Sequence, residues 1–247
     1  MNNTLPYKTL DIRGYVVHHY DMVDSTSIIC QKDLYQKSGY KMAIIANDQE
    51  AGRGRLGSTW QSMRGNLMTT VILPLQEEKS VWSDFSFITA LAVSDCVSMF
   101  LDNTKVEIKW PNDVLVNGAK ISGVLLEAYE HTLCIGVGIN VLSAPIIGKY
   151  NTTCLSSLGA DVDKNTLLNI LLERIDVWHN ALKISGLEGI LPIYRVRLMG
   201  VDKKILIRTL QENHCGVFKG VDDTGQAVLE LTDGDVKKLT AGEISFE

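Results

Sequence analysis

Apolar residues in the first third of the chain recur in short runs that fit the two-residue period of β-strands. These runs cover residues 15–20, 40–46 and 67–73, and turn-forming polar residues and glycines separate them. Between the first two runs, a cluster of aspartate, serine and threonine precedes Ile28 and predicts a short helix that ends near Gly39. The N-terminal part is therefore expected to combine strands with one short helix.

Longer stretches show the 3.6-residue spacing of amphipathic helices. Residues 82–101 carry one apolar stripe, a second stripe covers 164–184 and stops at Gly186, and 187–198 predicts a further helix. The stripe of the first of these helices is formed by Phe85, Ile88, Leu91, Ala92 and Met99. We interpret these side chains as core and assign them no role in binding.

The centre of the chain predicts an antiparallel meander. Asn117-Gly118 stands between apolar runs, which is the strongest short-range signal for a hairpin turn. A run at 133–141 follows a short turn near Glu130, so we expect it to return as a third antiparallel strand. Nucleotide-binding folds with parallel sheets would need a helix between such strands, and none is predicted here.

Beyond Gly200 the pattern changes to short strands separated by polar turns. The runs lie at 204–208, 215–221, 227–231 and 243–246, with turn sequences such as Asp-Asp-Thr-Gly between them. This pattern predicts a small β-barrel. Because no long linker precedes it, we expect the barrel to pack directly on the rest of the chain.

These elements combine helices with an antiparallel meander and a small β-barrel. We expect a large domain over residues 1–198 and a small β-barrel domain over 199–247. A chain of 247 residues with 45% hydrophobic content can form such a core without disulfides. The five cysteines form no C-x-x-C pair and the five histidines lack zinc-finger spacing, which favours buried thiols in a reducing compartment.

Charge and targeting signals narrow the range of partners. The formal net charge of -5 argues against a general nucleic-acid-binding surface. The N-terminus lacks the apolar segment of a signal peptide, and the long uncharged run at 132–148 contains Asn140 and Pro145, which favours a buried strand and loop over a membrane helix. The chain is therefore expected to be cytoplasmic, with neither a nucleic-acid partner nor a membrane partner.

Candidate chemistry starts with a loop in which three glycines and two arginines precede Trp60. The segment Gly52-Arg53-Gly54-Arg55-Leu56-Gly57 combines backbone freedom with guanidinium groups that bind phosphate or carboxylate oxygens. Its spacing also fits G-x-G-x-x-G, but a β-like run follows where that fingerprint requires a helix, which disfavours a dinucleotide site. We predict an anion-binding loop, with a solvated turn as the alternative.

A second group of polar residues interrupts the predicted central sheet. Lys109, Asn112 and Asp113 surround a proline, and Lys120 stands opposite them across the predicted hairpin. Asparagine and aspartate oxygens suit a hard cation, and lysine offsets phosphate charge, so with the loop arginines they indicate a site for an ATP triphosphate and Mg²⁺. Taken singly, Lys120 is typical of a solvated lysine and Asn112-Asp113 of a turn.

Two further patterns indicate the approach of a ligand. Ser25, Thr26 and Ser27 place three hydroxyl groups at a predicted helix N-terminus, which suits an anion or a urea-like ligand, with a simple N-cap as the alternative. Gly136 and Gly138 lie within a predicted strand, where missing side chains indicate a ligand or backbone close by, with tight sheet packing as the alternative.

Taken together, these motifs resemble those of the biotin protein ligases. The resemblance rests on the glycine and arginine loop with Trp60, on residues 109–113, on Lys120 with Gly123, and on residues 136–140, and it extends over nearly the whole chain. It implies an α+β catalytic domain related to the class II synthetase folds, with a mixed, largely antiparallel sheet, followed by an SH3-like β-barrel.

The resemblance also implies a reaction. Biotin and Mg-ATP would form biotinyl-5'-AMP with loss of pyrophosphate, and a lysine of a biotin carboxyl carrier domain would then attack the mixed anhydride. Mg²⁺ and ATP are therefore the expected cofactor and co-substrate, and the carrier protein is the expected partner. A homodimer is compatible with this interpretation. Only about twenty residues precede Ser25, so we expect a monofunctional ligase without the winged-helix DNA-binding domain of the bifunctional members.

The resemblance assigns site residues in groups. Those expected to contact biotin are Ser25, Thr26, Ser27, Gln49, Gly52, Arg53, Trp60, Lys120 and Gly123. Those expected to contact ATP or the adenylate are Arg53, Arg55, Asn112, Asp113, Lys120 and Asn140. Arg55 and Lys120 are the expected catalytic residues, and Asn112 and Asp113 are the expected magnesium environment. The loop at 142–153 would cover the adenine.

Two departures and two alternatives accompany this interpretation. Ser27 stands where many relatives carry Asn or Gln, and Phe246-Glu247 ends the chain where some members carry a basic residue that helps to bind ATP. Lipoate ligases and octanoyltransferases share the implied fold and are the alternative enzymes, although they generally lack the Gly-Arg-Gly-Arg loop. A non-catalytic biotin-binding sensor is the alternative from another class.

Overall fold

The computed structural model describes residues 5–32, 35, 39–75, 77–129, 132–148 and 150–246. Eight of its strands form one sheet in the order β1-β2-β3-β4-β8-β7-β6-β5. The β2 and β3 strands pair in parallel, and the other neighbours in this sheet pair antiparallel. Their bounds are β1 Lys8–Ile12, β2 Tyr15–Val23, β3 Met42–Gln49, β4 Leu67–Pro74, β5 Val106–Lys109, β6 Asp113–Val116, β7 Ala119–Tyr129 and β8 Thr132–Ile139. The predicted mixed, largely antiparallel α+β fold is confirmed.

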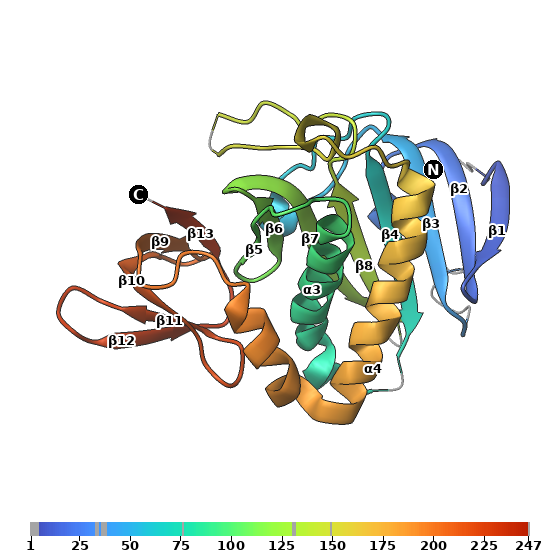
Figure 1. The fold of residues 1–247 in the computed structure, drawn as a ribbon. Coiled ribbons are helices and arrows are strands. Elements are labelled where there is room, and N and C mark those ends of the chain that lie inside the picture. Colours follow the sequence, from blue (N-terminus) through green and yellow to red (C-terminus); the bar gives the residue numbers. More distant parts are fainter. Residues whose placement is uncertain are drawn as a thin grey trace.

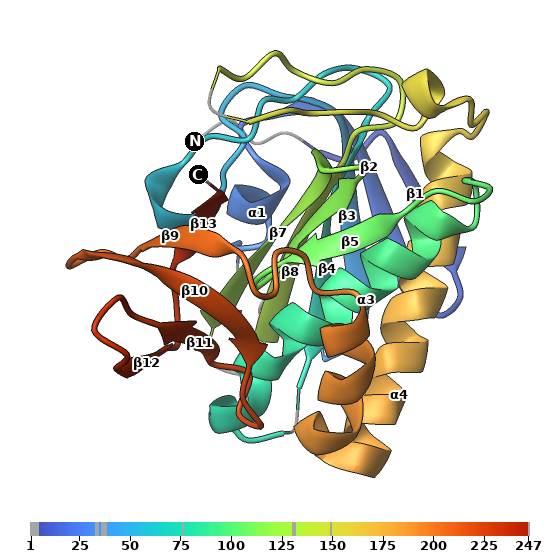
Figure 2. The same ribbon diagram turned by 60° about the vertical axis from the view of Figure 1, so that its left-hand side comes forward.

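Two long helices cover one face of this sheet, as Figures 1 and 2 show. The α3 helix (Phe85–Ser98) follows a 3₁₀ turn at Lys79–Asp84, and α4 spans Lys164–Val196. Gly186 has φ 62° inside α4, so the predicted division into two helical segments is confirmed. The interpretation of Met99 as core is wrong, because this residue caps the end of α3 and is 61% exposed.

The shorter helical pieces lie near the loops. The helix α1 covers Thr26–Ile29, and 3₁₀ turns lie at Arg55–Gly57 and Ser156–Leu158. The first helix was predicted to continue to near Gly39, but residues 30–32 form a turn after α1, and residues 33, 34 and 36–38 lie outside the described residues. In the described part of the chain, no helix has both the length and the apolar composition that a membrane crossing requires.

The central meander has the predicted geometry. Asn117 and Gly118 have φ values of 49° and 78°, as a two-residue hairpin turn between β6 and β7 requires. The β7 and β8 strands then pair antiparallel, with Gly123 opposite Gly138. The β1 strand was not predicted, because its residues are mostly exposed at the edge of the sheet and carry no apolar run.

The C-terminal strands form a second, antiparallel sheet in the order β12-β11-β10-β9-β13. Their bounds are β9 Lys204–Arg208, β10 Asn213–Val221, β11 Ala227–Glu230, β12 Val236–Leu239 and β13 Glu243–Phe246. This sheet fits the SH3-like barrel implied by the resemblance. The exposed, lysine-bearing β12 was not predicted.

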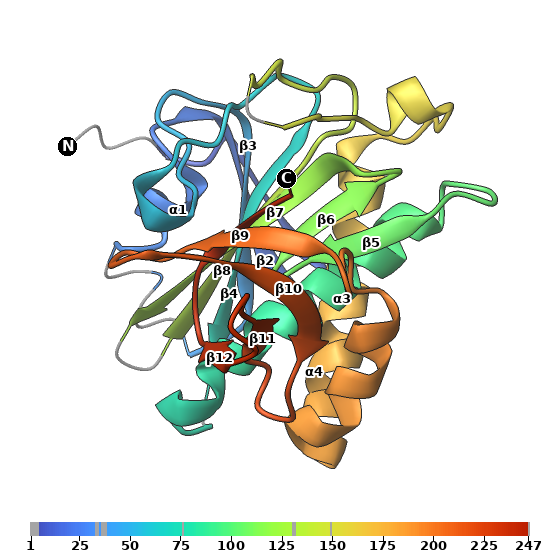
Figure 3. The ribbon, with the colours of Figure 1, turned by 90° about the vertical axis from the view of Figure 1, so that its left-hand side faces the viewer.

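The barrel packs directly on the rest of the protein, next to the second half of α4 (Figure 3). Its apolar residues, including Phe218, belong to the same hydrophobic cluster as the large sheet, α3 and α4. Trp110 Nε1 donates to the backbone oxygen of Gly225 at 3.0 Å, and Lys109 Nζ donates to that of Ile244 at 3.3 Å. Four of the five cysteines are buried thiols as predicted, and Cys215 is partly exposed.

Candidate active site

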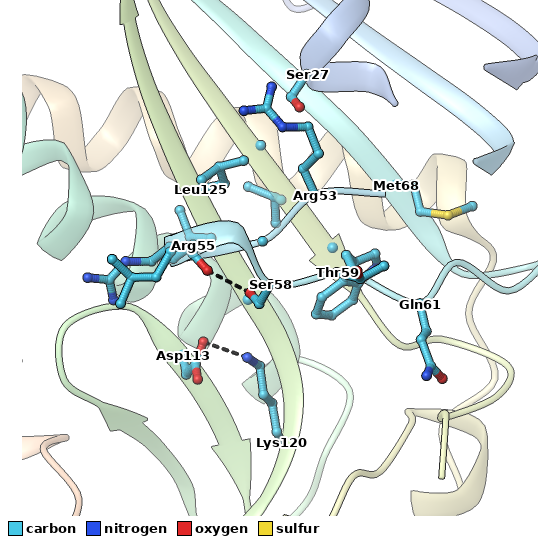
Figure 4. Close-up of a pocket in the computed structure, with 18 of the residues that line it drawn as sticks. Ser27, Arg53, Arg55, Ser58, Thr59, Gln61, Met68, Asp113, Lys120 and Leu125 are labelled. Atoms are coloured by element: carbon cyan, nitrogen blue, oxygen red, sulfur yellow. Dashed lines mark hydrogen bonds and ion pairs between the residues drawn. The ribbon is translucent and has the colours of Figure 1, made fainter. Parts of the chain in front are cut away.

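A cavity of about 600 Å³ opens where the large sheet, the glycine loop and the barrel meet. Figure 4 shows side chains of the glycine loop, among them Arg53 and Arg55, together with side chains of the large sheet such as Asp113 and Lys120. Most of the predicted site residues line its wall, namely Ser25, Thr26, Ser27, Gln49, Arg53, Arg55, Trp60, Asp113, Lys120 and Gly123. The fold therefore brings together residues that lie almost one hundred positions apart in the sequence.

The hydroxyl cluster forms one buried wall of the cavity. The backbone nitrogen and Oγ1 of Thr26 donate to Gln49 Oε1 at 2.8 and 3.1 Å. Thr70 Oγ1 in turn donates to Thr26 Oγ1 at 2.9 Å, and Ser25 Oγ lies 3.0 Å from Ser27 Oγ. Ser25 is the N-cap residue of α1, but its side chain makes no capping hydrogen bond. The hydroxyls are thus arranged for a polar, uncharged ligand group.

A compact charge cluster forms the opposite wall. Lys120 Nζ lies 2.8 Å from Asp113 Oδ1, and Lys109 Nζ lies 3.3 Å from Asp113 Oδ2. Burial alone would raise the pKa of Asp113, but the two lysines outweigh this effect and lower it. One carboxylate thus faces two ammonium groups, which leaves net positive charge for an anion.

The glycine loop closes on itself through its backbone. Gly54 N donates to Ser58 O at 2.8 Å, and Trp60 N donates to Gly52 O at 3.0 Å. The loop contains a 3₁₀ turn and leads into β4, so the described structure has no helix where a dinucleotide fingerprint requires one. Gly52 is needed at this neck, because a Cβ there would overlap the backbone oxygen of Trp60.

The two loop arginines point in different directions, as Figure 4 shows. Arg55 Nη1 donates to Asn112 Oδ1 at 3.2 Å, on the side of the charge cluster. Burial lowers the pKa of Arg55, and the nearby carboxylates of Asp113 and Glu243 oppose this shift. Arg53 extends toward Ser27 and pairs with Glu127 of β7. The loop therefore offers one guanidinium at each end of the cavity.

Glycines on β7 and β8 make room for a side chain of the protein itself. A Cβ at Gly138 would overlap the Trp60 ring, and a Cβ at Gly123 would lie 3.2 Å from it. A Cβ at Gly136 would meet only ordinary van der Waals contacts. The strand glycines predicted a nearby ligand or backbone, whereas the close neighbour of Gly138 is the Trp60 side chain, and Gly136 has no close neighbour.

The side-chain oxygens of the predicted magnesium residues, Asn112 and Asp113, are already paired with cationic side chains. Both oxygens of Asp113 face lysines, and the side-chain oxygen of Asn112 faces Arg55. Asn112 Nδ2 donates to the backbone oxygen of Val124, which fixes the amide. Among the described residues, no group of three or more His, Cys, Asp and Glu side chains could hold a metal ion. This donor set fits phosphate and carboxylate groups better than a resident cation.

Asn140 lies behind the cavity wall. Its Nδ2 donates to Thr153 O at 3.0 Å, and the residue is 1% exposed. The Oδ1 atom of the neighbouring Asn66 accepts from the backbone nitrogens at 141–143, where the loop predicted to cover the adenine begins. A contact between Asn140 and adenine remains a prediction. Gly52 and Asn112 likewise do not line the cavity.

Several residues near the cavity were not predicted as site residues, and three of them contact the predicted ones or carry charge. The ring of Tyr150 lies between Lys109 and Lys120, with their Nζ atoms 5.8 and 5.5 Å from its centroid. Glu243 reaches the wall from the barrel, and Thr70 supports Thr26 from β4. Tyr150 belongs to the loop at 142–153 that was predicted to cover the adenine, whereas the positions of Glu243 and Thr70 depend on contacts between distant segments. Of the two terminal residues, Phe246 packs on Gly200, and Glu247 lies outside the described residues.

The fold and the site together define an α+β domain whose cavity has a wall of hydroxyl groups at one end and the cations Lys120 and Arg55 at the other. The model of the biotin/lipoate A/B protein ligase family matches residues 20–140. A biotin–acetyl-CoA-carboxylase ligase of Paracoccus denitrificans is 30% identical over 215 residues, which cover 82% of this chain and 89% of that protein. This chain therefore belongs to the biotin/lipoate A/B protein ligase family, among its biotin protein ligases.

Solved structures show the same fold. A biotin protein ligase from Aquifex aeolicus in complex with biotin and ATP matches with a TM-score of 0.81 and 27% identity, covering 93% of this chain and 97% of that chain. A biotin protein ligase from Leishmania major in complex with biotinyl-5-AMP matches with a TM-score of 0.65 and 25% identity, covering 91% and 98%. Both similarities extend over the large sheet and the barrel.

Proposed function

We propose that this protein is an ATP-dependent biotin protein ligase. In the first step, a carboxylate oxygen of biotin attacks the α-phosphorus of ATP, which gives biotinyl-5'-AMP and releases pyrophosphate. In the second step, the amine of a carrier lysine attacks the acyl carbon, which gives a biotinyl amide and releases AMP and a proton. The observation that carries this proposal is the single cavity with a buried hydroxyl wall at one end and the Arg55 and Lys120 cations at the other.

The hydroxyl wall is suited to the ureido ring of biotin. Ser25, Thr26 and Gln49 offer donors and acceptors that are already ordered by hydrogen bonds to one another and to neighbouring side chains. Such preorganisation reduces the entropy lost on binding. Ser27 adds a third hydroxyl, and Trp60 and Gly123 form an apolar wall for the rest of the molecule.

The cationic end is suited to the reacting groups. Lys120 and Arg55 offset the negative charge that develops as the carboxylate approaches the α-phosphate, and Asp113 holds Lys120 in place. Arg53, Asn112 and Asn140 are proposed to support the nucleotide. Mg²⁺ would accompany the ATP phosphates, because the donor set around Asp113 does not itself favour a cation.

The domain division, the acceptor and the cellular location are proposed on the same basis. We propose a catalytic unit over residues 1–198 and a barrel unit over 199–247, with a biotin carboxyl carrier protein as the acceptor. A cytoplasmic location is supported by thiol cysteines and by the need for ATP. The net charge of -5 supports a protein that binds no nucleic acid. A homodimer is compatible with these features, and sedimentation with and without ligands measures it.

The test of this function is transfer of biotin. Purified protein is mixed with biotin, Mg-ATP and an acceptor carrier domain, and covalent biotin is measured by mass spectrometry. We expect a single biotinyl group on the carrier lysine. Transfer of lipoate or octanoate in place of biotin would identify the alternative enzymes of this fold. Biotin binding without biotin-dependent exchange of pyrophosphate into ATP would identify a sensor.

A further inference from the structure

An ion pair joins the glycine loop to the central sheet. Arg53 Nη1 lies 3.0 Å from Glu127 Oε1. Glu127 stands near the end of β7, the same strand that carries Lys120, and it belongs to none of the motifs described above. Its second oxygen, Oε2, is buried and has no hydrogen-bond partner among the described residues. Among the described residues, Arg53 is therefore the ion-pair partner of this carboxylate.

Burial distinguishes this pair from an ordinary surface ion pair. The Glu127 side chain is only 16% exposed, whereas Arg53 is 42% exposed. Pairs in which both partners are exposed contribute little, because water replaces either partner readily. When one partner is partly buried, removal of the other leaves a charge that is poorly hydrated. Separation of Arg53 from Glu127 is therefore unfavourable, because it leaves the partly buried Glu127 carboxylate on β7 without its counter-charge.

Arg53 lies at the neck of the glycine loop, so its ion pair with Glu127 connects this neck to β7. Arg53 is bridged to Thr59 at the neck of the loop, next to the hydrogen bond from Trp60 N to Gly52 O. Arg55 follows two positions later and reaches across to Asn112. Because the neck backbone is held together, fixing Arg53 on β7 also fixes the direction in which Arg55 extends.

We propose that Glu127 is a positioning residue for the ligase reaction. It acts through Arg53, holds the neck of the glycine loop against β7, and so keeps Arg55 beside the reacting groups. Its role in the reaction rests on the proposed function, whereas the ion pair by which it holds the loop against β7 does not. Loss of this contact frees the loop to open, which lets water in and biotinyl-AMP out.

Limited proteolysis measures how firmly Glu127 holds the loop and does not depend on enzyme activity. Trypsin cleaves after Arg53 and Arg55 faster when the loop leaves the sheet, and mass spectrometry of the fragments gives the cleavage rate. We expect Glu127→Gln to speed cleavage of the loop about 5- to 30-fold, the range that corresponds to one or two kcal/mol. Glu212→Gln is the matched control, because it removes an exposed carboxylate that pairs with Lys237 in the barrel.

A second variant tests the pair from the loop side. Arg53→Met removes the partner at an exposed position and leaves the Arg55 cleavage site intact, so it remains informative if Glu127→Gln fails to fold. We expect the double variant Arg53→Met with Glu127→Gln to be cleaved no faster after Arg55 than the faster single variant, because both changes break one contact. Additive acceleration, or cleavage at the wild-type rate in a folded single variant, would overturn the proposal.

Release of the intermediate tests the role in the reaction. We expect Glu127→Gln to release biotinyl-AMP into solution several-fold faster than wild type, with a smaller change in the rate of pyrophosphate exchange. Unchanged release together with faster loop cleavage would leave Glu127 a structural residue and overturn its positioning role. If the wild-type protein makes no biotinyl-AMP, the proposed function fails, and the proteolysis result still decides whether Glu127 holds the loop.

Discussion

At the scale of single residues, the two arginines of the loop differ in what holds them. Arg53 is paired with Glu127 on the sheet, whereas Arg55 reaches the charge cluster through Asn112. Burial makes the Arg55 guanidinium harder to keep hydrated, and the carboxylates of Asp113 and Glu243 compensate part of this cost. An arginine in this state binds an incoming anion strongly, because little water must be displaced.

Replacement of Arg55 by alanine should therefore weaken retention of the adenylate. We expect the Arg55→Ala variant to release biotinyl-AMP about 10- to 100-fold faster, which corresponds to the loss of a hydrogen bond to a charged group. Release is measured by rapid filtration or chromatography of the free intermediate. Arg64→Ala is the control, since Arg64 is 60% exposed and pairs with Asp21 and Asp48. Equal release by the Arg55 variant and the wild type would contradict the role given to Arg55.

At the scale of elements, the glycines of β8 matter through the Trp60 ring. Gly138 pairs with Gly123 across β7 and β8. Because neither residue has a side chain, the Trp60 ring packs directly on the sheet backbone there. The ring is thereby held between the sheet and Lys120, whose Nζ lies 5.9 Å from its centroid. The loop and the sheet thus share one packing contact near the cavity.

The Gly138→Ala variant tests this contact. A methyl group there would overlap the Trp60 ring, so we expect the free energy of unfolding to fall by about 1–3 kcal/mol, measured by denaturant titration. Gly136→Ala is the matched control on the same strand and should change stability less, because its Cβ meets only ordinary contacts. In a Trp60→Ala background the penalty at Gly138 should largely disappear. A penalty that persists without the ring would show that the overlap is not its cause.

At the scale of the whole molecule, a polar cluster joins α4 to the segment between β4 and α3. His179 Nε2 and Lys183 Nζ lie 3.1 and 3.0 Å from Glu77 Oε1. Burial alone would raise the pKa of Glu77, but hydrogen bonds from its own backbone, Lys183 and His179 outweigh this and lower it from 4.5 to about 2. Burial likewise lowers the pKa of His179.

These shifts predict acid sensitivity. Because the pKa of Glu77 is lower in the folded protein, its contribution to stability is present above about pH 4.5 and is lost as the pH falls toward about 2. We expect the Glu77→Gln variant to be less stable than wild type near neutral pH and to show a flatter decline in this window, measured by urea unfolding at each pH. Glu78→Gln is the control, since that carboxylate accepts from Ser80 instead. An unchanged pH profile in Glu77→Gln would contradict the assignment.

The sequence by itself determined the features that depend on neighbours in the chain. The Asn117-Gly118 hairpin, the break at Gly186 and the positions of most strands along the chain follow from turn chemistry and from the spacing of apolar residues. Most of the predicted site residues also lie in the cavity wall, because the loop arginines, the hydroxyl cluster and Lys120 belong to compact motifs.

Only the tertiary structure decided which residues meet across distant segments. Long-range packing decides the pairing of Arg53 with Glu127 and the contact of the Trp60 ring with Gly138. It also decides that Asn140 lies behind the cavity wall. Edge strands such as β1 and β12 also escaped prediction, since exposed strands need no apolar alternation. Local patterns fix the backbone of an element, whereas the partner of a side chain is chosen by the register and packing of the whole fold.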